Sequence, residues 1–373
     1  MGEAVKFQCE RDALVDGLAT TGRAVAQRAA SGALTTAIRM DAQGSRLTLT
    51  ATDLSLTLRV SVDAVGSEDG ICMAPARLVT EIVRAMEPGA VTVTGSDTEI
   101  EVTGGRSRFV MQTYAPALFP TIPEHTDPQV TLPATELTEA IDQVARAAST
   151  DPARPLLCGV MFAKEGSGWR LVATDSYRLA WRDLSAEMQM PPETESVIVP
   201  ARALTELERL CKGEPNAVGV SVGPLDATAT FSVRGVHLTT RLLEGHFPDY
   251  QVLVPSECPT GARVQKALLT DALRRMKLLV KDQSTPVRLA TTDAGIDLSV
   301  VSPDFGSASE TVEASVKGPE IQTAFNPTFL IEGIDAVSGD EVAIDMTDAT
   351  HPALISSPTS RAYRCLLMPI RVS

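Results

Sequence analysis

Ala51-Thr52-Asp53, Ala173-Thr174-Asp175 and Thr291-Thr292-Asp293 are three similar tripeptides, each placed after a short apolar stretch and before a second run of alternating apolar residues. Their aspartates lie 122 and 118 residues apart. A near-constant period indicates that one structural unit is used repeatedly, and this period is far too long for a solenoid repeat. The sequence therefore predicts a whole domain that occurs three times.

Prolines keep a similar period. Pro75, Pro200 and Pro327 each stand at the start of a helical pattern, where the missing N–H of proline costs nothing because that group would be unpaired anyway. A second landmark lies near the end of each third, in Phe119-Pro120, Phe247-Pro248 and Met368-Pro369. These agreements favour three copies of one unit over chance similarity of a tripeptide.

Each third begins with a strand that leads into a helix, and alternating stretches such as Arg46–Thr50 follow. Each unit is thus an α+β domain of ordinary size, with two helices and about eight short antiparallel strands. The domain boundaries that we expect are 1–128, 129–255 and 256–373. The expected helices cover residues 11–29, 75–86, 134–148, 200–212, 265–282 and 327–337.

Composition agrees with a soluble intracellular protein. The chain has 373 residues, of which 44% are hydrophobic and only 4% aromatic, which suits small β-rich cores packed with Leu, Val and Ala. No apolar run approaches the roughly 18 residues that span a bilayer, and Met1–Lys6 has no signal-peptide core. The sequence predicts a cytoplasmic location.

The cysteines and histidines do not form a metal site. The six cysteines, at positions 9, 72, 158, 211, 258 and 365, are scattered without a CxxC pair, and the four histidines are dispersed as well. Reduced, mostly buried thiols that behave as small hydrophobic side chains are the simplest interpretation. We expect no metal and no cofactor.

Catalysis is not indicated. Asp53, Asp175 and Asp293 stand at strand ends, where catalytic acids often lie. An active site is normally built once, however, so a residue repeated in every unit is better explained by hydrogen bonds from its carboxylate to turn amides. Gly166-Ser167-Gly168 fits neither a dinucleotide fingerprint nor a P-loop. A hydrolytic enzyme that uses the repeated aspartates is the remote alternative.

The charge distribution is informative. The formal net charge is −14, which argues against tight binding of nucleic acid, because affinity for DNA comes chiefly from phosphate neutralisation. The six expected helices hold 14 Lys and Arg against 12 Asp and Glu, so that they carry +2 and the rest of the chain −16. On charge alone, these helices would simply be solvated faces.

Several segments resemble the bacterial DNA polymerase III beta subunit, the replicative sliding clamp. They are the stretch Leu171–Ala180, the segment Glu244–Tyr250 with its Phe-Pro-Asp-Tyr, and the terminal Leu367–Val372 with its Met-Pro-x-Arg. The resemblance covers essentially the whole chain. It implies a DNA sliding clamp that is not an enzyme: a head-to-tail homodimer whose six domains close a ring around duplex DNA, with helices inside and sheets outside. The modest positive balance of the helices then suits weak, sliding contacts.

The resemblance also implies partners and sites. The partners are duplex DNA, the polymerase III catalytic subunit, the clamp loader, and other polymerases and repair proteins with clamp-binding peptides, and the location is nucleoid-associated. A hydrophobic peptide-binding pocket between the second and third domains would be lined by Leu157, Thr174, Ser176, Tyr177, Arg178, Leu179, Pro248, Leu253, Thr350, Pro352, Leu366, Met368, Pro369, Ile370 and Arg371. DNA contacts would come from Arg28, Arg154, Lys277 and Lys281. The dimer interface would join Phe109 and Met111 on an edge strand to Leu278 and Leu279 on a helix.

Three places depart from the familiar family pattern. Ser176-Tyr177-Arg178-Leu179 stands where Gly-His-Arg-Leu is common, Val252 replaces a basic residue, and Ala29–Leu34 lacks the usual proline-containing run. These changes bear on the choice of partner and not on the fold. They leave open a second, specialised clamp whose altered pocket escapes an inhibitor of the housekeeping copy, which would give antibiotic resistance.

Overall fold

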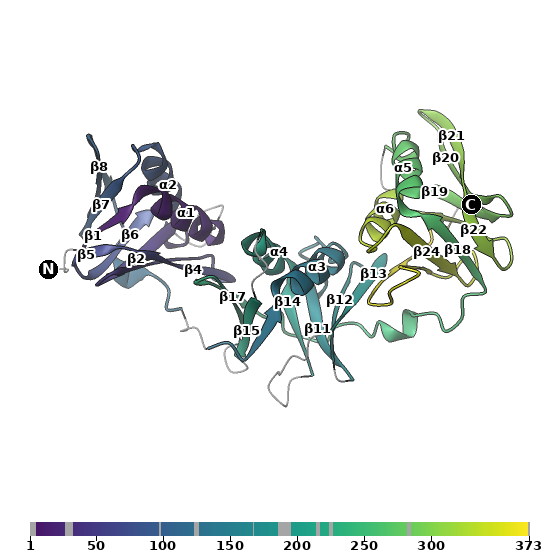
Figure 1. Cartoon of the computed structure of the whole chain (residues 1–373), viewed down its shortest axis with the longest axis horizontal. Coiled ribbons are helices and arrows are strands. Elements are labelled where there is room, and N and C mark those ends of the chain that lie inside the picture. Colours follow the sequence, from purple (N-terminus) through teal and green to yellow (C-terminus); the bar gives the residue numbers. More distant parts are fainter. Residues whose placement is uncertain are drawn as a thin grey trace. The chain divides into compact units, whose positions relative to one another are not determined.

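The computed structural model describes residues 5–26, 33–96, 98–122, 127–166, 168–185, 195–213, 217–223, 227–281 and 285–371. These residues form two compact units, one made of Met1–Thr131 with Asn216–Leu242 and the other of Leu132–Pro215 with Leu243–Ser373. The segment 216–242 belongs to the first unit because its strands extend a sheet of that unit. Figure 1 labels the elements along the chain.

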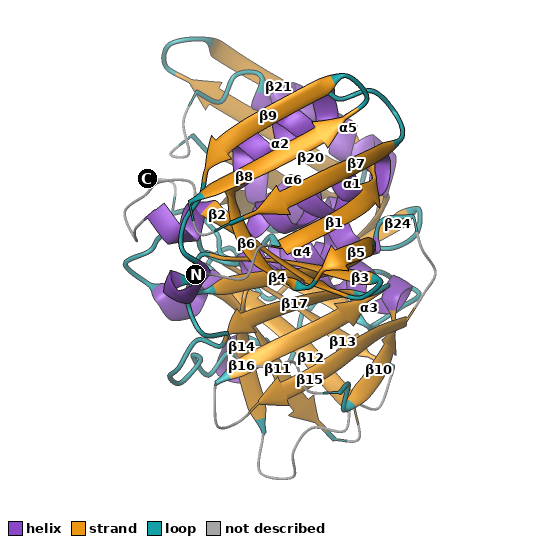
Figure 2. Ribbon diagram, turned by 90° about the vertical axis from the view of Figure 1, so that its left-hand side faces the viewer, coloured by secondary structure: helices purple, strands orange, loops and turns teal. Residues whose placement is uncertain are grey.

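The first unit contains α1 and α2 and two sheets. The helices are α1 (Arg11–Thr21) and α2 (Ala76–Ala85). One sheet has the order β5-β1-β7-β8-β9, and Figure 2 shows β1, β7, β8 and β9 side by side. Its strands are β1 (Val5–Glu10), β5 (Val65–Glu68), β7 (Ala90–Gly95), β8 (Glu99–Gly104) and β9 (Ser107–Gln112).

The other sheet of this unit has the order β10-β15-β16-β17-β4-β3-β2-β6. The strands are β2 (Ala37–Gln43), β3 (Arg46–Thr52), β4 (Leu56–Asp63), β6 (Gly70–Pro75), β10 (Val130–Pro133), β15 (Ala217–Gly223), β16 (Thr228–Val233) and β17 (Val236–Arg241). Helix α1 contacts β1 of the first sheet and β3 and β4 of this one. At Gly17 an added Cβ would lie 2.8 Å from Leu49 and Val62, so this helix packs closely on the sheet.

Four α-helices are described in the second unit, and they pack in pairs, α3 on α4 and α5 on α6. Their bounds are α3 (Ala134–Ala145), α4 (Ala201–Cys211), α5 (Lys266–Lys277) and α6 (Pro327–Asp335). Pro327 is the first residue of α6, and the side chain of the preceding Asn326 accepts hydrogen bonds from the amides of Thr328 and Phe329. This arrangement explains the third proline of the landmark, because proline fits the first turn and an asparagine cap satisfies the free amides. Pro75 and Pro200 lie one position earlier relative to their helices, as the N-cap residues of α2 and α4.

Two sheets complete the second unit. The larger has the order β14-β11-β12-β13-β26-β25-β24-β18-β22 and the smaller β21-β20-β19-β23. The strands are β11 (Gly159–Glu165), β12 (Gly168–Thr174), β13 (Arg178–Leu184), β14 (Ser196–Pro200), β18 (Thr260–Gln265), β19 (Val287–Thr292), β20 (Gly295–Ser302), β21 (Gly306–Val312), β22 (Ala314–Lys317), β23 (Gln322–Phe325), β24 (Glu341–Met346), β25 (Ala353–Ser356) and β26 (Tyr363–Leu367). The 3-10 turn Pro155–Cys158 precedes β11.

The threefold α+β repeat is confirmed, with two helices and eight or nine described strands in each third. The helices end earlier than expected in several places. Helix α5 ends at Lys277, so Leu278 and Leu279 lie in the turn that follows it and not on the helix itself. Residues 27–29 of the first expected helix lie outside the described part of the chain.

The third tripeptide does not lie at the corner that the other two share, so the expectation for it was wrong. The sheet orders β6-β2-β3-β4, β14-β11-β12-β13 and β23-β19-β20-β21 align strand by strand. Ala51–Asp53 and Ala173–Asp175 therefore occupy the same corner, before β4 and β13, whereas Thr291–Asp293 lies in the hairpin between β19 and β20. The equivalent third corner is Ser302-Pro303-Asp304, before β21. The similarity of the third tripeptide to the other two is misleading, because Thr and Asp are common at any tight strand connection.

The cysteines are free thiols, as expected from their spacing. Cys9, Cys72, Cys211 and Cys365 are buried, whereas Cys158 and Cys258 are half-buried. Burial raises the pKa of Cys9 and Cys365 to about 11 and that of Cys72 to about 12. Because the thiolate is the reactive form, these three thiols are inert near neutral pH.

We therefore predict an order of alkylation. Iodoacetamide at mildly alkaline pH should label Cys158 and Cys258 first, because their sulfurs are partly accessible, and should label all six cysteines only in urea. Peptide mass spectrometry over time gives the rates. Labelling of Cys72 as fast as Cys158 in the folded protein would contradict the packing described above.

Candidate peptide-binding site

The second unit gathers most of the pocket residues that the resemblance implies around the corner between β12 and β13. Asp175 Oδ1 accepts hydrogen bonds from the amides of Tyr177 (2.9 Å) and Arg178 (3.0 Å). Ser176, which lies between Asp175 and Tyr177, has φ 79°, in the left-handed region that non-glycine residues rarely occupy. The aspartate therefore stabilises a tight corner that projects the side chain of Tyr177 outward, 61% exposed.

The first unit repeats this corner. Asp53 Oδ1 accepts hydrogen bonds from the amides of Ser55 (3.0 Å) and Leu56 (2.8 Å), and Leu54 has φ 77°. The structural role expected for Asp53 and Asp175 is thus confirmed. For Asp293 the expectation was wrong: β19 ends at Thr292 and pairs with Gly295 at the start of β20, so Asp293 belongs to a two-residue hairpin turn.

Arg178 is held in a buried polar network. Its side chain is 9% exposed, and its guanidinium forms ion pairs with Asp175 (3.1 Å) and Glu332 and donates to the backbone carbonyl of Arg146. It also lies 4.3 Å from the centre of the Phe329 ring. Since Arg146 follows α3 and Glu332 belongs to α6, Arg178 ties β13 to two helices. Its guanidinium is committed inside the chain, so its part in the site is to position the corner.

Leu179 lies on the other face of β13. Successive side chains of a strand point to opposite faces, and Leu179 packs with Trp181, Leu366 and Tyr250 in a buried apolar cluster. Leu156, Phe247 and Val254 are half-buried against this cluster. Leu253 beside them stays exposed, as does Pro248, and Leu157 is half-buried. The face thus offers a buried apolar floor with accessible apolar residues around it.

The C-terminal segment crosses from one sheet to the other beside this corner. Strand β26 pairs with β13, with Leu366 opposite Leu179. The amide of Met368 then donates to the carbonyl of Tyr177 (3.0 Å), and the amide of Ile370 donates to the carbonyl of Ala324 in β23 (2.7 Å). Met368, Pro369 and Ile370 are half-buried along this path.

A cavity of about 570 Å³ opens where this segment meets β23. Thr350, Pro369, Ile370 and Arg371, all expected at the site, are among its lining residues. The sequence did not point to its other lining residues, which are Arg288, Gln322, Thr323, Ala324 and Ala349. Only the pairing of β19 with β23, in which Arg288 faces Ala324, brings them here, and no short motif in the sequence signals that pairing.

Asp348 organises the loop that carries Thr350 and Pro352. Its carboxylate accepts hydrogen bonds from the amide (2.7 Å) and hydroxyl (2.8 Å) of Thr350 and from the amide of His351 (3.0 Å). These hydrogen bonds hold the pKa of Asp348 well below its usual range. The bond from the Thr350 amide has the largest effect, that from the Thr350 hydroxyl comes next, and those from His351 contribute less. The carboxylate therefore stays charged near neutral pH, and Thr350 keeps a fixed position at the cavity. Pro352 lies two residues beyond it, half-buried.

The residues expected to contact DNA are not gathered on helices. Arg28 lies outside the described residues. Arg154 lies in a turn before β11, pairs with Asp151 (3.2 Å), and donates to the carbonyl of Asp175 (3.2 Å) and the hydroxyl of Ser176 (3.3 Å). It thus supports the corner of the candidate peptide site. Lys277 is exposed at the end of α5, and Lys281 follows it, 3.4 Å from Asp304.

The residues expected at the dimer interface differ in accessibility. Phe109 on the edge strand β9 is 40% exposed and Leu278 is 83% exposed, whereas Leu279 is partly exposed. Met111 is already buried within its own chain, where it is only 7% exposed and lies opposite Ile100 of β8. Of these four residues, Phe109 and Leu278 therefore expose the most apolar surface to a second chain.

The described part of the chain holds no group of three or more His, Cys, Asp or Glu side chains that could bind a metal ion. Among the described helices, none combines the length and apolar character needed to cross a membrane.

Comparisons with known proteins agree along the whole chain. Family models of the DNA polymerase III beta subunit match its N-terminal domain at residues 5–123, its central domain at 131–249 and its C-terminal domain at 251–371. The beta sliding clamp of Streptomyces coelicolor is 32% identical over 377 residues, which cover 99% of this chain and 100% of that protein. The beta sliding clamp homolog GriR of Streptomyces muensis is 30% identical and covers 98% of this chain and 99% of its own length.

Solved structures give the same picture. The sliding clamp of Bartonella birtlesii bound to griselimycin has a TM-score of 0.93 at 27% identity, with 99% of this chain and 100% of that chain covered. The DNA polymerase sliding clamp of Bacillus subtilis has a TM-score of 0.92 at 25% identity, with the same coverage.

The buried network around Arg178 generates a stability prediction. Replacing one partner of a buried ion pair leaves the other partners unsatisfied, which costs on the order of 3 kcal/mol. We expect Arg178→Gln to lower the free energy of unfolding by about this amount in urea titrations followed by circular dichroism. Arg154→Gln is the matched control, since its pair with Asp151 is solvent-accessible and contributes less than about 1 kcal/mol. Equal losses in the two variants would refute the assigned role of Arg178.

Proposed function

Because the chain belongs to the DNA polymerase III beta subunit family, we propose that it is a sliding clamp, a non-enzymatic processivity factor that encircles duplex DNA and tethers the replicative polymerase. The single observation that carries this function is that the three family domains cover the chain from residue 5 to residue 371 in their family order. We place the domain boundaries at 1–128, 129–255 and 256–373, and we propose that the protein acts on DNA in the nucleoid.

A head-to-tail dimer follows from the way the repeats join. The last strand of the second repeat, β17, pairs with β4 of the first, and the last strand of the third repeat, β26, pairs with β13 of the second. Strand β21 occupies the equivalent position in the third repeat and is an edge of its sheet. The last strand of the first repeat, β9, is also an edge. An edge strand offers unpaired backbone groups to another chain, so β9 of one copy can pair with β21 of a second.

Side chains support this pairing. Phe109 is exposed on β9, and α5, which ends just before Leu278, contacts β21. A dimer made in this way would bury Phe109 and Leu278 at the same junction, with Leu279 and Met111 behind them. Two such junctions close a ring, because each copy carries both edges.

Contacts with DNA would come from the end of α5 and from the segment that follows it. Lys277 and Lys281 remain candidates, together with Arg28, whereas the three polar contacts of Arg154 favour a role at the peptide site. Weak contacts suffice because a closed ring is held on duplex DNA by topology, and strong phosphate contacts would slow its movement.

The site around Tyr177 and Met368 would bind a short linear peptide from the polymerase, and likewise from the clamp loader and from repair proteins. Its apolar floor and accessible apolar rim would supply the affinity, while Arg371 and the backbone beside the cavity would orient the peptide. Both parts of the site lie within one compact unit.

The specialised, inhibitor-resistant clamp is a less favoured alternative. GriR, a sliding clamp homolog, matches at 30% identity, yet the beta sliding clamp of Streptomyces coelicolor matches at 32%. Similarity therefore gives no preference for a specialised role. The substitution that places Tyr177 at the corner is the feature of this chain that would alter inhibitor binding.

The ring predicts retention that depends on DNA topology. After loading, the protein should stay on nicked circular DNA during gel filtration and leave when the circle is cut. Leu278→Asp with Leu279→Asp should give monomers in sedimentation velocity and abolish retention, because burying each leucine contributes on the order of 1.5–3 kcal/mol. The control is Leu268→Asp, an exposed leucine near the start of α5, which should still sediment as a dimer. A dimeric double variant would show that the interface is elsewhere.

The pocket predicts binding of a fluorescent peptide of the type Gln-x-x-Leu-x-Phe/Leu, measured by anisotropy. Removal of residues 368–373 should abolish binding, because Met368 and Ile370 make the backbone bonds that hold the site together. Tyr177→His should tighten binding, since the larger ring covers the site until it rotates away. Leu118→His, an exposed leucine of the first unit, is the control and should leave affinity unchanged. Equal or weaker affinity of Tyr177→His would show that Tyr177 lines the site without covering it.

A further inference from the structure

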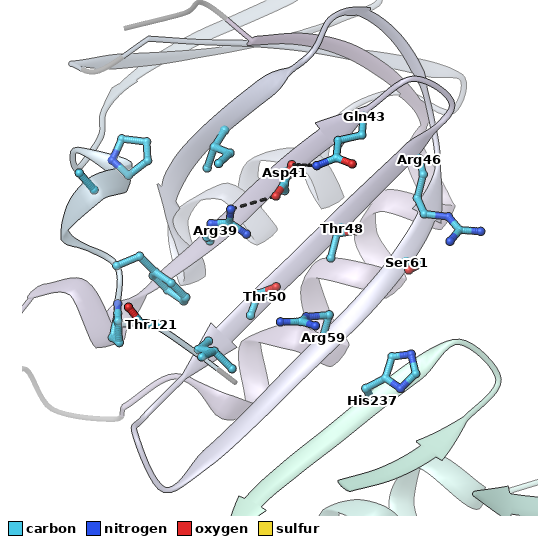
Figure 3. Close-up of a pocket in the computed structure, with 16 residues that line it drawn as sticks. Arg39, Asp41, Gln43, Arg46, Thr48, Thr50, Arg59, Ser61, Thr121 and His237 are labelled. Atoms are coloured by element: carbon cyan, nitrogen blue, oxygen red, sulfur yellow. Dashed lines mark hydrogen bonds and ion pairs between the residues drawn. The ribbon is translucent and has the colours of Figure 1, made fainter. Parts of the chain in front are cut away.

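A second cavity, of about 860 Å³, lies in the first unit. It is formed by one face of β2, β3, β4 and β17 together with the segment 116–122, and it shares no residue with the candidate peptide site. Figure 3 shows its polar side chains along the strands. Leu49, Val60 and Val62 of these strands are buried toward α1, so the alternation of strand side chains places the cavity on the opposite face of the sheet.

Strand register builds a row of polar side chains across this face. Arg39 of β2 lies opposite Thr50 of β3, Thr50 opposite Arg59 of β4, and Arg59 opposite His237 of β17. Neighbouring strands are about 4.8 Å apart, so the two arginines flank the threonine at about that spacing on each side. Figure 3 shows Thr50 between Arg39 and Arg59.

Thr50 has an unmet hydrogen-bonding need. Its side chain is 1% exposed, and its hydroxyl has no hydrogen-bond partner among the described residues. A buried polar group without a partner is destabilising, and such groups are rare in native proteins. The unpartnered hydroxyl therefore points to a ligand that approaches between the two arginines.

The charge of the cavity is opposite to that of the protein. Its described lining residues include three arginines, Arg39, Arg46 and Arg59, and one carboxylate, Asp41, which pairs with Arg39 (2.9 Å). The whole chain has a net charge of −14. An excess of cationic groups in a concave site of an acidic protein favours an anionic ligand.

The shape of the row selects among anions. A carboxylate has two oxygens and is satisfied by one guanidinium in a bidentate pair, which would leave Thr50 without a partner. A phosphate monoester has three terminal oxygens and can accept from Arg39, Thr50 and Arg59 at once. Phe119, half-buried in the facing segment, lines the same cavity and offers an aromatic surface for a base. The cavity volume is in the range of small-molecule sites.

We propose that this cavity binds a phosphate-bearing ligand of the mononucleotide class, with the phosphate on Arg39, Thr50 and Arg59 and the base against Phe119. The site is separate from α1, because it lies on the opposite face of the sheet. A clamp with such a site would respond to free nucleotide independently of its peptide partners.

Isothermal titration calorimetry of the full chain, in a buffer free of phosphate and divalent metal, tests the proposal. The probes are deoxyadenosine monophosphate, inorganic phosphate and deoxyadenosine. The monophosphate should bind best, phosphate more weakly, and deoxyadenosine not measurably. Arg59→Gln and Thr50→Val should each weaken binding of the monophosphate at least about tenfold, because each removes a hydrogen bond to a charged group. Phe119→Ala should reduce its affinity to that of phosphate.

Two controls keep the result specific. Arg77→Gln removes the same charge from α2, where Arg77 pairs with Glu81 at the surface, and should bind like the parent. Thr50→Val should also raise the melting temperature of the unliganded protein, because it removes an unpartnered buried hydroxyl. Absence of binding by the parent, parental affinity in Arg59→Gln and Thr50→Val, or binding of a short oligoglutamate peptide in place of phosphate would overturn the proposal.

Discussion

The pairing of the last strand of each repeat with the strand after the corner of the preceding repeat is the constraint on which this structure depends. Backbone hydrogen bonds of β17 to β4 and of β26 to β13 make two repeats share one sheet. An antiparallel ladder fixes register residue by residue, since a slip by one position would turn every buried side chain to the other face. The join between β13 and β26 therefore also fixes where the C-terminal segment meets the corner at Tyr177.

The equivalent corners of the first two repeats make different contacts. In the first two repeats an aspartate closes the turn with the same two amide bonds, and a residue with positive φ follows it. In the second repeat, Arg178 adds ion pairs with Asp175 and Glu332 that tie the corner to a helix of the third. The first corner has Leu56 at the position of Arg178. A turn that is common to the first two repeats thus forms the edge of the candidate peptide site only where a charged side chain and the C-terminal segment converge on it.

The sequence predicted the parts of this protein that local patterns encode. Alternation and helix-start prolines gave the repeat, the fold class and the places of the helices, because these depend on short-range spacing. It misplaced the third corner, since Thr-Asp pairs suit more than one turn, and it placed Leu278 on a helix that ends one residue earlier. The contribution of β23 to the cavity beside Ile370 depends on pairing with β19, a contact that no local pattern contains.

For the same reason, the sequence could not predict the row formed by Arg39, Thr50, Arg59 and His237. These residues are spread over nearly the whole first unit and become neighbours only through the register of four strands. Thr50 looks in the sequence like one more polar residue of an alternating strand. Its significance comes from its burial together with the lack of a described hydrogen-bond partner for its hydroxyl, and both are visible only in the three-dimensional structure.

Electrostatics connects the acidic composition with a protein that moves along DNA. Many cations on or beside the helices are already paired within the chain: Arg146 with Asp142, Arg209 with Glu206, Arg274 with Asp271 and Asp335, and Arg275 with Glu310. The side-chain bonds from Arg275 hold the pKa of Glu310 below its usual value, so this carboxylate stays charged near neutral pH. A phosphate must compete with such a carboxylate for the same guanidinium, which lowers the gain from each contact. Weak contacts of this kind let a ring slide, and the ring closure that we propose through edges β9 and β21 then has to supply the retention that charge does not.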